Sequence, residues 1–132
     1  MSVVVWSDEK MCLGRQDMDD THREMVDLIN RVAEAGKETF AQRFGELVTH
    51  THQHFAHELE LMQMSGDPAQ KEHEHQHAKL LGEMAAMQSR VDRGQIKMAR
   101  AFVAERLPEW LLLHAASMDS MLAAHLKSSG EA

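Results

Sequence analysis

Seven polar side chains interrupt stripes of apolar residues that otherwise have the spacing of buried helix faces. They are His22, the pair His54 and Glu58, the pair His73 and His77, and His114 with Asp119. Residues four apart on a helix project from the same face, so each pair presents two groups together. Imidazole and carboxylate groups buried without partners are strongly destabilising. Their placement therefore indicates that they bind something, and a metal ion is the first candidate.

Counting residues from the predicted loops places these groups at one depth of a helical bundle. His22 lies about 15 residues before the first loop, and His54 lies about 16 residues after it. His54 lies about 12 residues before the second loop, and His77 lies about 11 residues after it. Glu58 and His73 lie about 8 and 7 from that second loop, and His73 and His114 each lie about 20 from the third. At about 1.5 Å of rise per residue, the members of each pair are level within a few Å. Six of the seven side chains are therefore predicted to converge.

Asp119 fits this count less well than the other six. It follows His114 by five residues, which is about 140° around a regular α-helix. A π-bulge between the two residues would return Asp119 to the face that carries His114, and such bulges favour functional sites. We therefore predict a π-bulge here, and a kink at Pro108 could also shift the helix axis. A regular helix would point Asp119 at solvent.

The composition of the set favours two metal ions. The sequence supplies no Arg or Lys at these depths to neutralise the carboxylates. Five imidazoles and two carboxylates exceed what one four-coordinate zinc ion binds, and they suit two six-coordinate ions that share the carboxylates. Imidazole with carboxylate favours iron, with manganese and zinc as competitors. The set contains no thiolate, which argues against an iron–sulfur cluster.

The predicted elements that position these residues are all helical. Gly and Pro are scarce, at seven and two, so each is taken to mark a boundary. We predict an all-α, antiparallel up-down-up-down four-helix bundle, with an N-terminal arm over 1–16 and helices over about 17–35, 39–64, 68–92 and 95–127. Thr39 and Asp67 are the expected N-caps of the second and third helices, and Met121 is expected on the buried stripe of the fourth. Pro108 should kink that fourth helix.

Length and charge narrow the class of protein. The 132 residues make one domain, and eleven methionines are taken mostly as core residues. A net charge of −7 without a Lys/Arg-rich run argues against nucleic acid or an anionic membrane as a partner. The apolar runs are too short for membrane insertion. The sequence has one cysteine, Cys12, which excludes an intrachain disulfide and fits a reducing compartment such as the cytoplasm. The polar outer faces of the helices suggest a monomer.

Five further histidines lie outside the predicted ligand set. His52 and His75 should face water, His57 lies on the flank of its face, and His125 is expected to be exposed. His50 lies one turn before His54 on nearly the same face. We interpret His50 as a surface residue or an outer partner of the metal ligands, with a role as an alternative ligand less favoured.

The chain resembles bacterial single-domain hemerythrins over nearly its whole length. The likeness rests on the Trp6 arm, on D-D-T-H-R-E-M around His22 with Asn30 downstream, and on H-F-A-H-E from His54 to Glu58. It continues in H-E-H-Q-H from His73 to His77 and in W-L-L-L-H-A-A-S-M-D from Trp110 to Asp119. Separate motifs in the same order make the match specific.

The resemblance implies a non-haem di-iron centre with an oxo or hydroxo bridge that binds O2 reversibly. One iron would take His73, His77 and His114, and the other would take His22 and His54 and keep an open position. Glu58 and Asp119 would bridge the two ions. The O2 pocket would consist of Phe55, Trp110, Leu111 and Ala115, where Ala115 replaces the bulky aliphatic residue common in the family. Less packing there should speed autoxidation.

The function expected from this resemblance is oxygen carriage, storage or delivery to an oxygen-consuming enzyme. A di-iron oxidase or peroxidase, a nitric-oxide-handling protein, an O2 or redox sensor, and an iron-storage protein are the alternatives. An enzyme would need a general acid near the open iron. The expected pocket offers none, and His50 is the one residue that could supply it, so we predict a binding protein rather than an enzyme.

Overall fold

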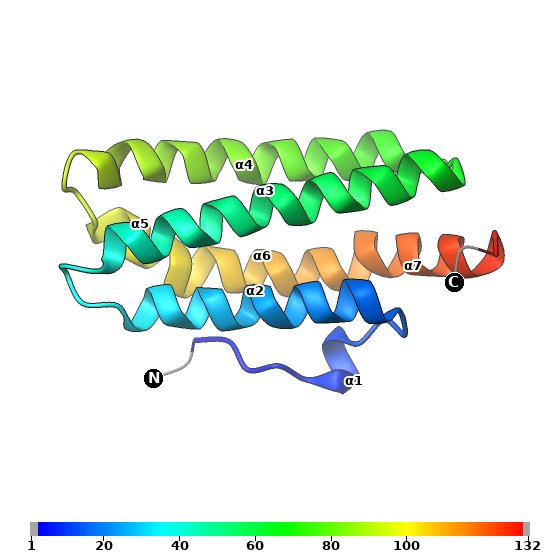
Figure 1. The fold of residues 1–132 in the computed structure, drawn as a ribbon, viewed down its shortest axis with the longest axis horizontal. Helices are drawn as coiled ribbons and strands as arrows, with labels where there is room; N and C mark the ends of the chain where they lie inside the picture. The colour runs from blue at the N-terminus through cyan, green and yellow to red at the C-terminus, as the bar shows by residue number, and fades with distance from the viewer. Residues whose placement is uncertain (1–2, 131–132) are drawn as a thin grey trace.

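Four helical rods lie side by side in the computed structural model, which describes residues 3–130 (Figure 1). The first three rods are α2 (Gln16–Glu34), α3 (Phe40–Ser65) and α4 (Gln70–Asp92). The fourth consists of α5 (Lys97–Ala101), η1 (Phe102–Arg106), α6 (Leu107–His114), η2 (Ala115–Asp119) and α7 (Ser120–Ser128). Successive rods run antiparallel. The predicted all-α four-helix bundle is therefore confirmed, and each rod agrees with its predicted range to within a few residues.

The fourth rod contains two π-helical segments, η1 and η2. In η1 the amide of Leu107 donates to the carbonyl of Phe102, five residues back, and in η2 the amide of Ser120 donates to Ala115 in the same way. The predicted π-bulge between His114 and Asp119 is confirmed. The η1 segment places Pro108 in the first turn of α6, where a helix tolerates a residue without an amide proton.

Each π-turn takes up extra residues, and this changes which side chains face the core further along. Met121, predicted on the buried stripe, is 54% exposed. That prediction was wrong because it assumed an unbroken period of 3.6 residues through η2. Leu122, predicted on the same stripe, is buried, and so is Leu126.

The two predicted N-caps differ in outcome. Thr39 precedes α3 but its side chain makes no capping hydrogen bond, so the predicted cap is wrong in that respect. Asp67 Oδ1 accepts from the amide of Ala69 at 3.0 Å, which closes a turn just before α4. The two caps show that a capping residue type does not ensure the capping bond.

The N-terminal arm is bound to α2 along its length and contains a short helix, α1 (Asp8–Met11). Asn30 Oδ1 accepts from the amides of Val3 and Val4, and Asn30 Nδ2 donates to the carbonyl of Val4 at 2.7 Å. Val4 and Met11 enter the core. Asp19 accepts from the amides of Leu13 and Gly14, so two side chains of α2 bind the backbone at the two ends of the arm.

The apolar core is divided in two by a layer of polar side chains. One cluster includes Met25, Phe55, Leu80 and Leu111, and the other includes Met18, Met62 and Leu122. Along α2, α3 and the fourth rod, the predicted ligand residues lie between members of the two clusters. His73 and His77 of α4 join the same layer through Glu58. Within residues 3–130, no helix is long and apolar enough to cross a membrane.

Candidate metal centre

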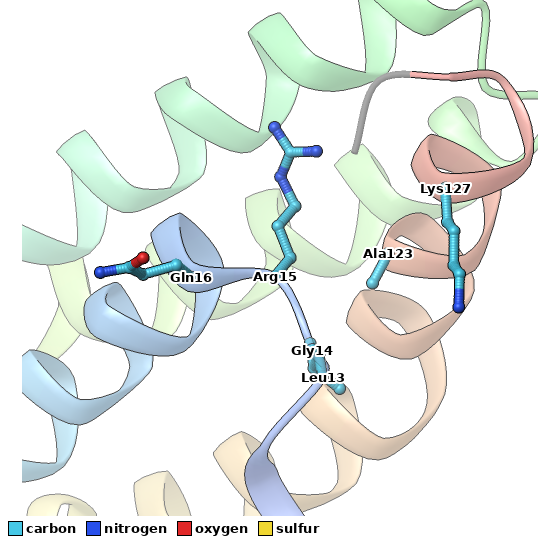
Figure 2. Close-up of a pocket in the computed structure, with 6 residues that line it drawn as sticks. All are labelled: Leu13, Gly14, Arg15, Gln16, Ala123 and Lys127. Atoms are coloured by element: carbon cyan, nitrogen blue, oxygen red, sulfur yellow. The ribbon is translucent and has the colours of Figure 1, made fainter.

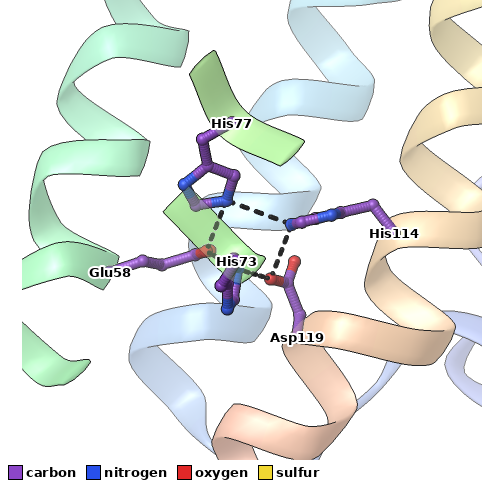
Figure 3. A group of neighbouring side chains, drawn as sticks. All are labelled: Glu58, His73, His77, His114 and Asp119. Carbon is purple, nitrogen blue, oxygen red and sulfur yellow. Dashed lines mark hydrogen bonds and ion pairs between the residues drawn. The ribbon is translucent and has the colours of Figure 1, made fainter. Parts of the chain in front are cut away.

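All seven predicted ligand side chains meet in this polar layer. None of them is more than 5% exposed: His22, His54, Glu58, His73, His77, His114 and Asp119. They come from all four rods, and Figure 3 shows five of them pointing toward one another from α3, α4, α6 and η2. The prediction that these residues converge is therefore correct, including the outlier Asp119.

Glu58 lies at the centre and contacts histidines with both of its oxygens. Its Oε1 lies 3.1 Å from His73 Nε2 and 3.2 Å from His77 Nε2. Its Oε2 lies 2.5 Å from His54 Nε2 and 3.8 Å from His22 Nε2. One oxygen therefore faces the α4 histidines, and the other faces the histidines of α2 and α3.

Asp119 divides its two oxygens in the same way. Its Oδ1 lies 3.0 Å from Nε2 of both His73 and His114, and its Oδ2 lies 2.9 Å from His22 Nε2. These distances are short, yet neither oxygen of Asp119, nor either ring nitrogen of His22, is aligned in a hydrogen bond within residues 3–130. Close contact between buried polar atoms that form no aligned hydrogen bond is expected of groups that share a cation.

The cluster forms two overlapping sets of possible ligand atoms. The atoms of Glu58, His73, His77, His114 and Asp119 lie within 4.8 Å of one another, and so do those of His22, His54, Glu58 and Asp119. Both carboxylates belong to both sets. We call the first set the three-histidine half and the second the two-histidine half.

The carboxylates dominate the electrostatics of the cluster. Burial lowers the pKa of His22 and of His73, but Asp119 and Glu58 outweigh it and raise both pKa values to about 9. Burial raises the pKa of Glu58, yet its histidine neighbours hold it well below its usual range. His77 differs, because burial lowers its pKa despite Glu58. Within residues 3–130 the ion pairs of these two carboxylates are with histidines and none is with Arg or Lys, which fits a site for cations.

Aromatic rings cover the three-histidine half. Phe55 stacks on His77 with ring centroids 3.7 Å apart and an interplanar angle of 2°. Trp110 stacks on His114 at 4.3 Å and 13°. Two of the four predicted pocket residues therefore contact histidines of this half. Leu111 and Ala115 are both buried, at 2% and 3% exposure.

Gln76 is a residue of the site that the motif analysis did not identify. Its Oε1 lies 3.0 Å from His114 Nδ1, across the gap between α4 and α6. It stands between His75 and His77 in the sequence, a position from which a partly exposed polar side chain without a role in the site is expected. A depth count could have found it, since it lies about 18 residues before Gly94 and His114 about 20 after it.

His50 lies beside the two-histidine half. Its ring centroid is 6.1 Å from that of His54, and its Nδ1 is 3.8 Å from Glu24 Oε2. Its Nε2 is buried without a hydrogen-bond partner among the described residues. Burial lowers the pKa of His50, and His54 adds to that effect. His50 therefore belongs to neither set of possible ligands but is adjacent to one.

The other spare histidines lie outside the cluster. His52 and His75 are exposed as predicted, and His57 lies at the flank with its Nε2 3.0 Å from Asp17 Oδ2. His125 was expected to be exposed, but it is half-buried and its Nε2 donates to the carbonyl of Ser65 at 2.9 Å. That expectation was wrong because η2 changes the phase of α7.

Two surface depressions differ in their relation to the cluster. A cavity of about 260 Å³ where the arm joins α2 is lined by Leu13, Gly14, Arg15, Gln16, Ala123 and Lys127. Its longer side chains point away from one another and none is a predicted ligand (Figure 2). A groove of about 240 Å³ between α3 and α4 includes Phe55 and His77 in its lining. That groove brings the molecular surface to the edge of the three-histidine half.

Comparison with known proteins agrees with this geometry. The model of the hemerythrin HHE cation binding domain matches residues 13–126. The chain is 32% identical to a bacteriohemerythrin of Ralstonia nicotianae over 130 residues, covering 98% of this chain and 93% of that protein. It is 28% identical to a bacteriohemerythrin of Stenotrophomonas maltophilia, covering 97% of this chain and 84% of that protein.

Solved structures show the same fold. A wild-type hemerythrin crystal structure aligns with a TM-score of 0.85 at 21% identity, covering 93% of this chain and 97% of that one. A leucine-to-alanine mutant of hemerythrin aligns with a TM-score of 0.87 at 21% identity, covering 96% and 98%. The family match includes all seven residues of the buried His/Glu/Asp cluster, and the chain belongs to the hemerythrin family.

Proposed function

We propose that this protein binds two iron ions in the cluster and binds O2 reversibly at the pair. His73, His77 and His114 would hold one ion, and His22 and His54 would hold the other. Glu58 and Asp119 would bridge them together with an oxo or hydroxo group. The observation that carries the proposal is that each carboxylate directs one oxygen to each half, which is how a bridging ligand must be placed.

The unequal number of histidines supports a place for O2. With the carboxylates shared, the ion held by His22 and His54 would have one protein ligand fewer than its neighbour. Two ferrous ions can each supply one electron to a bound O2, which is the chemistry that the metal pair adds. The residues of the chain would hold the two ions and limit the access of water to them.

The lining predicted for O2 supports binding rather than catalysis. Phe55, Leu111 and Ala115 are buried and apolar, and Trp110 is half-buried with its ring against His114. None of the four can act as a general acid or base. An apolar pocket limits proton supply to the bound O2, and this favours its release unchanged.

The test is the optical spectrum of the anaerobically reduced protein before and after air is added, with iron counted per chain. We expect about two irons and a new charge-transfer band that fades when O2 is removed. His73→Ala should abolish the band, and the matched control His75→Ala, an exposed histidine two residues away, should keep it. Two irons with no band on adding air would contradict O2 binding, and no retained iron would contradict the site.

A di-iron oxidase or peroxidase is the second candidate, and His50 is the observation that favours it. The buried, unpartnered Nε2 of His50 lies beside the two-histidine half. If His50 supplies protons, air should convert the reduced protein irreversibly to the ferric form, and His50→Phe should restore reversibility. Reversible O2 binding by the unaltered protein excludes this alternative.

The cellular setting remains a prediction of the sequence. We propose a monomer in the cytoplasm that carries, stores or delivers O2 to an oxygen-consuming enzyme. The single cysteine supports a reducing compartment.

A further inference from the structure

Gln76 reaches across from α4 to His114 on the opposite rod. Its Oε1 lies 3.0 Å from His114 Nδ1 in a part-buried position. The other ring nitrogen of His114, Nε2, lies 3.0 Å from Asp119 Oδ1 and 3.1 Å from His77 Nε2. Nε2 is therefore the nitrogen that faces the cluster, and Nδ1 is the one that faces outward to Gln76.

This geometry constrains the tautomer of His114. A histidine that gives the Nε2 lone pair to a metal must carry its remaining proton on Nδ1, and that proton needs an acceptor. The carbonyl oxygen of Gln76 is such an acceptor. Trp110 stacks on the face of the same ring at 4.3 Å. The hydrogen bond restrains rotation of the ring within its plane, and the stacking restrains its tilt.

Other histidines of the cluster lack such a partner. Nδ1 of His22, His54 and His73 is buried and makes no hydrogen bond within residues 3–130. Gln76 therefore gives His114 an orientation that those three rings do not receive from any described side chain.

We propose that Gln76 is a positioning residue that fixes the Nδ1–H tautomer of His114 and so strengthens metal binding in the three-histidine half. The inference rests on the metal-binding part of the proposed function and requires neither iron nor O2. Partners of this kind typically change metal affinity by about 10- to 100-fold when they are removed.

The test uses the full chain loaded with zinc, and it measures the rate at which zinc passes to an excess of chelator. Gln76→Met keeps the length of the side chain and removes the acceptor. We expect zinc release in two phases, with the slower one from the three-histidine half. Gln76→Met should speed that slower phase by about 10- to 100-fold. Gln76→Glu keeps the acceptor and should restore slow release. The matched control is Gln88→Met, a glutamine of the same helix that bonds to Asp92 instead.

A second readout follows the proton itself. In ¹⁵N-edited spectra of the zinc-loaded protein, His114 Nδ1–H should exchange slowly, and Gln76→Met should make it exchange fast. Equal zinc release from the Gln76→Met and Gln88→Met proteins, or failure of Gln76→Glu to rescue, would overturn the role of Gln76 alone. Zinc retained by none of the proteins would instead overturn the metal site.

Discussion

The two halves of the buried cluster share both carboxylates and differ in what surrounds their histidines. In the three-histidine half, Phe55 stacks on His77 at 3.7 Å, Trp110 stacks on His114 at 4.3 Å, and Gln76 accepts from His114. In the two-histidine half, His22 and His54 meet edge to face at 5.1 Å, and His50 and Phe55 meet the His54 ring at a tilt. Among the described residues, Nδ1 of His22 and of His54 is unpartnered, as is Nδ1 of His73 in the other half.

Under the proposed function this polar layer would perform two tasks, and the difference suits one half to each. Rings held by stacking and hydrogen bonding keep one geometry, which suits an ion that is held permanently. Rings with fewer constraints tolerate a change in coordination, which suits an ion that gains and loses a ligand. We infer that the three-histidine half anchors the pair and that the two-histidine half reacts.

Removing a shared carboxylate should affect both halves and give the largest effect. Asp119→Asn keeps the shape of the side chain but removes the charge that contacts His22, His73 and His114. We expect metal affinity to fall by more than about 100-fold at both positions, measured by competition with a chelator. The neighbouring exposed residue supplies the control, Ser120→Ala. Loss of only one ion would mean that Asp119 does not bridge.

Removing one histidine of the two-histidine half should remove the ion of that half and leave the ion of the other half bound. His22→Ala should leave about one ion per chain, because the other half keeps three histidines and both carboxylates. Metal analysis after gel filtration measures the ratio, with His52→Ala, an exposed histidine, as control. A protein that still bound two ions, or none, would contradict the assignment of the anchor.

The pH dependence of stability should change sign when metal is bound. In the metal-free protein, Asp119 and Glu58 raise the pKa values of His22 and His73 to about 9 against the lowering effect of burial. Because the unfolded value is about 6.5, this stabilisation is complete below pH 6.5 and is lost as pH rises through 9.

Urea denaturation between pH 6.5 and 9 measures this effect. The free energy of unfolding of the metal-free protein should fall by about 2 to 3 kcal/mol for each of the two histidines. The zinc-loaded protein should gain stability over the same range, because zinc binds the neutral imidazoles. A metal-free protein that became more stable toward pH 9 would refute the electrostatic account.

Filling space in the predicted O2 pocket should give the smallest effect. Ala115 is buried directly after His114, at the start of η2. Ala115→Ile should exclude water and slow autoxidation several-fold, that is, by about 1 kcal/mol in activation free energy. Ala116→Ile, at the adjacent exposed position, is the control. The rate of decay of the oxygenated spectrum measures the effect, and an unchanged or faster rate after Ala115→Ile would refute it.

The ligand set could be predicted from the sequence because helical spacing and loop distance are both local quantities. His54 and Glu58 are four residues apart, and the rise per residue converts the distance from a loop into depth. The same arithmetic indicated that Asp119 would need a π-bulge. The arithmetic failed beyond that bulge, at Met121 and His125, because a change in helical phase moves every later side chain.

Residue types and spacing by themselves determined that a His/Glu/Asp layer would lie across a four-helix bundle and that it would suit metal ions. Only the tertiary structure decided which oxygen of Glu58 and of Asp119 faces which histidines. It also decided that Gln76 contacts His114 and that Phe55 and Trp110 cover one half. Apart from His54–Glu58, Trp110–His114 and His114–Asp119, which lie within one rod, these contacts join different rods. They therefore depend on how the helices are rotated about their axes, which cannot be read from the spacing within one helix.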